Sequence, residues 1–84
     1  MRIWVKIVTD GKIIKDTVFK NRAPMSLVNL TEALKDVCYE FDLPTPLLID
    51  IQYRHFVKFN IVTLTQKDFI ENVDFDKFII ENWI

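Results

Sequence analysis

The sequence predicts a small α+β domain with a largely antiparallel sheet of about four strands and one or two helices packed on one face. Its 84 residues, half of them apolar, suit one hydrophobic core and one domain spanning residues 1–84. Asp10 and Gly11 stand between two runs rich in β-branched residues, which is typical of a hairpin. Apolar residues then recur at helical spacing from Leu27 to Phe41.

The N-terminal hairpin combines residues 2–9 and 12–19 with a two-residue Asp-Gly turn of type I′. A turn of this length sets the pairs Thr9 with Lys12, Ile7 with Ile14, Val5 with Asp16, and Ile3 with Val18. The face predicted to meet the core therefore carries Ile3, Val5, Ile7, Ile14 and Val18. Asp16 is the one polar residue in that row, and it signals that the register can differ.

The other face of the hairpin mixes aromatic, aliphatic and basic residues: Arg2, Trp4, Lys6, Val8, Ile13, Lys15, Thr17 and Phe19. One interpretation is structural, with lysine stems and the chain's own ends shielding the rings. The other is a contact surface for a partner or for a second copy of the chain. The candidate interaction residues are Trp4, Phe19, Lys6, Lys15 and Trp83.

The first helix is expected to begin after Ser26, a natural N-cap, and to bury one row of side chains: Leu27, Leu30, Leu34, Val37, Cys38 and Phe41. It is expected to end near Asp42, because Pro44 and Pro46 follow.

Residues 46–57 allow two interpretations. Thr45 as N-cap and Pro46 as first helical residue favour a second helix, whereas the density of β-branched and aromatic residues allows a strand from Leu47 to Tyr53. The helix is favoured. Residues 61–64 then predict a short strand.

The C-terminal part begins with Thr65 and Asp68, spaced as in a capping box, which predicts one or two helical turns reaching Asn72. Asp74 and Asp76 are expected in a turn, and residues 76–83 in a final strand.

The string Asp68-Phe69-Ile70-Glu71, followed by Val73-Asp74-Phe75-Asp76, resembles a group of short uncharacterised bacterial proteins that share a DF-x-E-x-VDFD pattern. The similarity covers nearly the whole chain. It implies a bacterial domain and brings no activity, cofactor or catalytic residue with it.

Charge is divided between the two ends of the chain although the net charge is only −1. Residues 1–22 hold six basic side chains against two acidic ones, and residues 66–84 hold five acidic against two basic. Such complementary ends are expected to lie side by side in the sheet. The near-neutral total disfavours recruitment of nucleic acid by a general electrostatic field.

Several kinds of site are excluded by residue counts. Gly11 is the only glycine, so phosphate-binding glycine loops are absent, and one cysteine with one histidine cannot build a zinc finger. Cys38 lies on the predicted buried row, where a thiol is inert, which disfavours a catalytic pair with His55.

The acidic residues Asp68, Glu71, Asp74 and Asp76 lack the spacing of a calcium loop and are interpreted as a solvated turn, not a metal site. No cofactor is expected, and no catalytic constellation is present, so the chain is predicted not to be an enzyme.

The longest charge-free apolar run, residues 43–49, is too short for a membrane span, and the N-terminus lacks the pattern of a secretory signal. With one cysteine, this predicts a cytoplasmic protein. The function expected is a non-enzymatic protein-interaction module or a self-associating domain, with an unidentified protein or a second copy as partner. The alternative is a single-stranded nucleic-acid-binding domain using the outer hairpin face, which the net charge and the lack of an RNP-like string disfavour.

Overall fold

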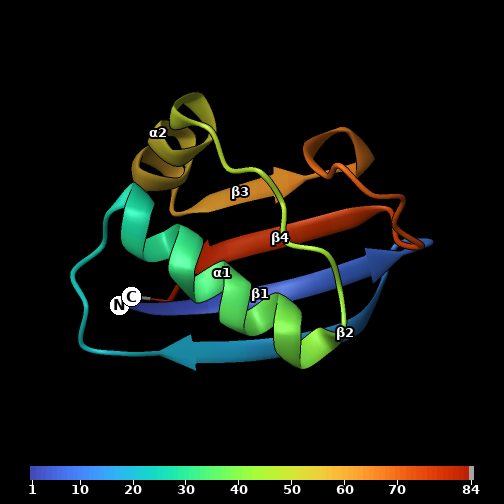
Figure 1. Cartoon of the computed structure of the whole chain (residues 1–84), viewed down its shortest axis with the longest axis horizontal. Helices are drawn as coiled ribbons and strands as arrows, with labels where there is room; N and C mark the ends of the chain where they lie inside the picture. The colour runs from blue at the N-terminus through green and yellow to red at the C-terminus, as the bar shows by residue number, and fades with distance from the viewer. Residues whose placement is uncertain (84) are drawn as a thin grey trace.

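Four antiparallel strands form one sheet in the order β2-β1-β4-β3, with α1 lying across one face of it (Figure 1). The computed structural model describes residues 1–83. The predicted α+β class is confirmed. The elements are β1 (Arg2–Thr9), β2 (Lys12–Lys20), α1 (Leu27–Phe41), α2 (Asp50–Phe59), β3 (Ile61–Leu64), the short 3-10 helix η1 (Gln66–Asp68) and β4 (Lys77–Asn82).

The two ends of the chain meet in the middle of the sheet, where β1 pairs with β4. The Trp83 backbone N–H donates to the Arg2 carbonyl at 3.0 Å. Lys6 on β1 pairs with Glu81 on β4 at 3.3 Å. The prediction that the complementary ends lie side by side is therefore confirmed.

The hairpin turn is as predicted, but the register of β2 is not. Asp10 and Gly11 have φ of 52° and 75°, as a type I′ turn requires. A bulge at Ile14 then shifts β2, which sets the pairs Ile7 with Lys15, Val5 with Thr17, and Ile3 with Phe19.

The bulge exchanges the two faces of β2 beyond Ile14. Phe19 packs against the core, while Ile14 is 54% exposed. Val18 and Asp16 stand opposite Trp4 and Lys6 on the other face. The predicted core positions of Ile14 and Val18 were wrong, because the shifted register turns the carboxylate of Asp16 away from the core and puts a phenylalanine ring against it.

α1 follows its prediction closely. The Ser26 hydroxyl accepts a hydrogen bond from the Asn29 N–H at 3.0 Å, and Asp42 ends the helix in the left-handed conformation. Its buried side is formed by Leu30, Ala33, Leu34, Val37, Cys38 and Phe41.

α2 is a helix, as favoured, but it begins at Asp50 instead of Pro46 and continues to Phe59. The preceding segment is held outside the helix, because the Leu47 N–H donates to the Asp68 carbonyl at 2.9 Å. The Gln52 side chain then accepts from the Ile49 N–H at 3.0 Å, which satisfies a donor at the true helix start.

Where one or two helical turns from Thr65 to Asn72 were predicted, the structure has only the single turn η1. The Gln66 side chain accepts from the Val73 N–H at 2.8 Å and donates to the Glu71 carbonyl at 3.0 Å, so the chain folds back after Phe69. This turn brings three phenylalanine rings into one cluster in the core, namely Phe69, Phe75 and Phe78.

Candidate interaction face

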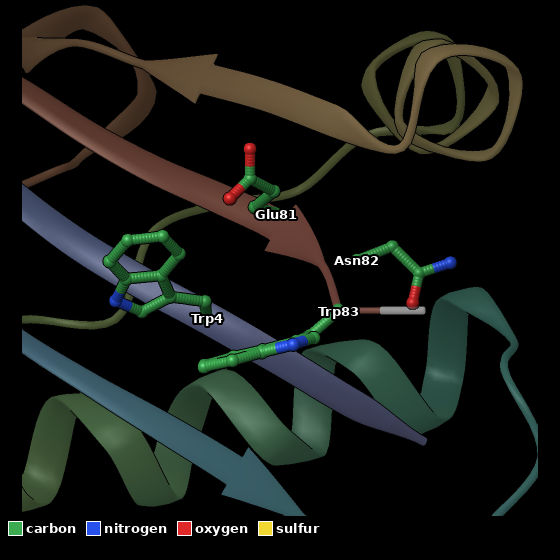
Figure 2. Close-up of a pocket in the computed structure, with 4 residues that line it drawn as sticks. All are labelled: Trp4, Glu81, Asn82 and Trp83. Atoms are coloured by element: carbon green, nitrogen blue, oxygen red, sulfur yellow. The ribbon is translucent and has the colours of Figure 1, made fainter.

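One face of the sheet carries α1 and the core, and in the described part of the chain no helix lies over the other. We call this other side the open face. The strand registers place on it Arg2, Trp4, Lys6 and Val8 of β1, Asp16, Val18 and Lys20 of β2, Ile61 and Thr63 of β3, and Lys77, Ile79 and Glu81 of β4, followed by Trp83. Figure 2 views the open face with α1 behind the strands.

Two tryptophans lie next to each other at one end of the open face (Figure 2). Their ring centroids are 5.6 Å apart and their planes are tilted by 42°. Trp83 is 45% exposed, and Trp4 is half-buried. Glu81 and Asn82 complete the lining of a shallow hollow of about 350 Å³ around the rings. The largest apolar side chains of this face are thus concentrated at one solvent-accessible place.

Polar contacts hold the Trp4 ring in position. Its indole N–H donates to the Asp16 carboxylate at 2.9 Å, and the Lys6 ammonium lies 4.1 Å from its ring centroid. The same ammonium pairs with Glu81, and the Lys6 side chain is only 13% exposed. A cation over the face of an indole is attracted by the ring. The Trp4 ring is therefore held by polar contacts on both its edge and its face.

Arg2 contacts both the backbone and the ring of Trp83. Its Nε donates to the Trp83 carbonyl at 2.9 Å, and its guanidinium carbon lies 5.9 Å from the Trp83 ring centroid. Because that ring lies beyond the end of β4, these contacts and the neighbouring Trp4 ring are what position it.

Of the five residues predicted to form the interaction surface, the structure brings together Trp4, Lys6 and Trp83. Phe19 and Lys15 lie on the opposite side of the sheet because of the bulge. The Lys15 ammonium donates to the Phe41 carbonyl at 3.4 Å, at the end of α1, and lies 6.0 Å from the Phe41 ring. It stabilises the C-terminal end of the helix, where cations are favoured.

Sequence reasoning missed Asp16 and Val18 as members of this face. The sequence did contain a sign of the different register, since Asp16 was the one polar residue in the predicted core row. A register shifted by one residue removes that conflict and moves Val18 with it.

The residues weighed for catalysis do not gather at this face. Cys38 is fully buried, and burial raises the pKa of its thiol to about 11, with a smaller opposing effect from a hydrogen bond to Thr45. His55 is exposed on α2 and stacks on Phe59, with ring centroids 4.6 Å apart.

His55 also borders a second shallow hollow of about 340 Å³ between α2, β3 and η1. The Asp68 carboxylate there accepts from the Gln52 amide at 2.6 Å and from the Thr65 N–H at 2.9 Å. Its two oxygens are thus engaged in holding the turn. Across residues 1–83, no three histidine, cysteine or acidic side chains lie close enough together to hold a metal ion.

Within the same residues, none of the helices has the length and apolar character that crossing a membrane requires. No family model, curated protein or solved structure matches this chain.

Proposed function

We propose that this chain is a non-enzymatic interaction domain that binds a protein, either a different chain or a second copy, through the open face. Trp4, Trp83 and Lys6 are the proposed contact residues. The observation that carries the proposal is the tilted tryptophan pair, with Trp83 45% exposed, on a sheet face that none of the helices described here covers. Tryptophan is enriched among the residues that dominate binding energy at protein interfaces.

The edge of the sheet is a poorer candidate than its face. β2 is an edge strand of nine residues, and a long free edge invites pairing with another strand. It carries Lys12, Lys15 and Lys20 and the bulge at Ile14, which are the features that protect edges against such pairing.

Single-stranded nucleic acid is the weaker candidate. Two of the residues that suggested it, Phe19 and Lys15, face the helices. The tryptophan hollow is lined by Glu81, and Asp16 lies beside Trp4, so carboxylates stand where a phosphate backbone would pass. A non-catalytic role is proposed because Cys38 is buried and Asp68 holds a turn.

A bacterial and cytoplasmic setting is part of the same proposal. It rests on the DF-x-E-x-VDFD string between Asp68 and Asp76 and on the single buried cysteine, which fits a reducing compartment.

The test is affinity capture from a lysate of the source organism with the wild type, Trp83→Lys and Tyr39→Lys. Tyr39 is the matched control because it is 90% exposed on α1, away from the open face. We expect Trp83→Lys to lose the proteins that the wild type captures and Tyr39→Lys to retain them, with unchanged circular dichroism for both. Equal capture by the Trp83→Lys variant would place the binding surface elsewhere.

A further inference from the structure

Charge is separated between the two sides of this nearly neutral molecule. The open face carries four basic side chains and two acidic ones, a surplus of two positive charges: Arg2, Lys6, Lys20 and Lys77 against Asp16 and Glu81. The exposed side of α1 and its C-cap carry four acidic side chains and one basic: Glu32, Asp36, Glu40 and Asp42 against Lys35. A partner approaching the sheet therefore meets a positive surface.

The two carboxylates of the open face are already engaged inside the molecule. Asp16 accepts from the Trp4 indole, and Glu81 pairs with Lys6. Lys20 and Lys77 are exposed, lie toward opposite ends of the face, and make no ion pair among residues 1–83. The unpaired positive charge thus lies at the two ends of the face, whereas between them Lys6 stands beside two carboxylates that the molecule's own side chains already engage.

From this arrangement we infer that the open face binds an acidic segment of another protein that carries a large apolar side chain. This inference rests on the proposed function. The apolar side chain fits the hollow at Trp4 and Trp83, a carboxylate next to it fits Lys20 at the same end of the face, and a carboxylate further along the segment fits Lys77 at the other end. An apolar anchor combined with peripheral charges is typical of protein interfaces, where the charges set specificity and association rate.

A second copy in a face-to-face arrangement fits this surface less well. Such a dimer brings two copies of the same positive rim together, and like charges across an interface oppose association. A nucleic acid fits less well for a different reason. Its negative charge is continuous along the strand and would cross the central Glu81 and Asp16 as well as the peripheral lysines.

Both tryptophans of the chain lie at this site, so intrinsic tryptophan fluorescence reports on it directly. The experiment titrates the full chain with a random copolymer of glutamate and tyrosine, a copolymer of lysine and tyrosine, and oligothymidylate. Excitation at the red edge of the indole band avoids tyrosine emission. We expect the acidic copolymer alone to shift the emission, with an affinity that falls as salt is added.

Two variants locate the binding. The double variant Lys20→Glu with Lys77→Glu removes both peripheral lysines. We expect it to bind the acidic copolymer with about tenfold lower affinity than the wild type. Lys35→Glu on α1 is the matched control and is expected to leave the affinity unchanged. For Trp83→Lys, binding is measured by the fluorescence anisotropy of a labelled acidic copolymer. We expect its affinity to be at least about tenfold lower than that of the wild type.

The outcomes separate this inference from the proposed function. Binding of the basic copolymer in place of the acidic one, lost in Trp83→Lys, overturns the acidic partner and leaves a protein-binding face. Binding of oligothymidylate overturns both. A sedimentation coefficient that rises with protein concentration in the wild type, but not in Trp83→Lys, would mean that a second copy of the chain occupies the open face. That result overturns the inference of a different protein. Equal affinity in the double lysine variant and in Lys35→Glu also overturns it.

Discussion

Cys38 illustrates how its surroundings decide the chemistry of a single side chain. The thiol is fully buried on α1, and burial raises its pKa from 9.0 to about 11. The thiolate is the nucleophilic form of cysteine, so a thiol held protonated at neutral pH is unreactive. Cys38 therefore belongs to the core of this protein and not to a site.

The raised pKa predicts a pH dependence of stability. Below pH 9.0 the thiol is protonated in both states, and its contribution to folding is intact. Between pH 9.0 and about 11 the unfolded chain loses this proton while the folded chain keeps it, so the free energy of unfolding falls with rising pH. The loss approaches about 1.4 kcal/mol per pH unit within that window.

Urea unfolding of the wild type and of Cys38→Ala, across the same pH range, isolates this effect. All other ionisable groups are the same in the two proteins, so the difference between the two slopes belongs to the cysteine. The wild type is expected to lose stability more steeply. Parallel slopes would show that the thiol ionises equally well in the folded state.

At the scale of elements, the connections between helices and strands contain residues in an unusual backbone conformation. Among residues 1–83, three residues other than glycine adopt positive φ: Asp10 at 52°, Asp42 at 57° and Asn60 at 60°. They lie in the hairpin turn, after α1, and between α2 and β3. For residues with a Cβ this conformation is costly, although asparagine and aspartate tolerate it best.

We predict that Asp42→Gly stabilises the protein by about 0.5–1 kcal/mol, because glycine adopts the left-handed conformation without the steric penalty. Asn60→Gly is the comparison. Its amide oxygen accepts from the Asn82 side chain at 3.2 Å, and glycine loses that bond, so no gain is expected there. Urea midpoints measure both effects. A midpoint for Asp42→Gly at or below that of the wild type would contradict the prediction.

α1 and the hairpin turn were predictable because their signals are local. Ser26 and the apolar spacing after it specify α1, and Asp10-Gly11 specifies the turn. The β2 bulge and the late start of α2 were not predictable in this way. The first depends on which β2 residues meet the core, and the second on Leu47 bonding to Asp68, twenty-one residues further along.

At the scale of the whole molecule, the sheet is closed by pairing between the first and the last strand of the chain. β1 and β4, the first and last strands, are its two central members, and the tryptophan pair lies across that junction. The sheet is thus held by pairing between the most distant parts of the chain, and the central pair forms only when the chain closes on itself.

This topology predicts a single cooperative unfolding transition. Tryptophan fluorescence reports the β1–β4 junction, while far-ultraviolet circular dichroism reports chiefly α1 and α2. We expect the two urea curves to coincide, as in small two-state domains. A fluorescence transition that precedes the loss of helix would contradict this prediction and show that β4 detaches on its own.

By itself, the sequence determined the α+β class, the hairpin turn, α1, the short strand β3 and the meeting of the two charged ends, because each follows from neighbouring residues or from overall composition. Only the tertiary structure decided which side chains share the open face. It kept Trp4, Lys6 and Trp83 there, added Asp16 and Val18, and removed Phe19 and Lys15. The reason is physical: one bulged residue reverses every later side chain of a strand, and only packing against the core selects where that residue lies.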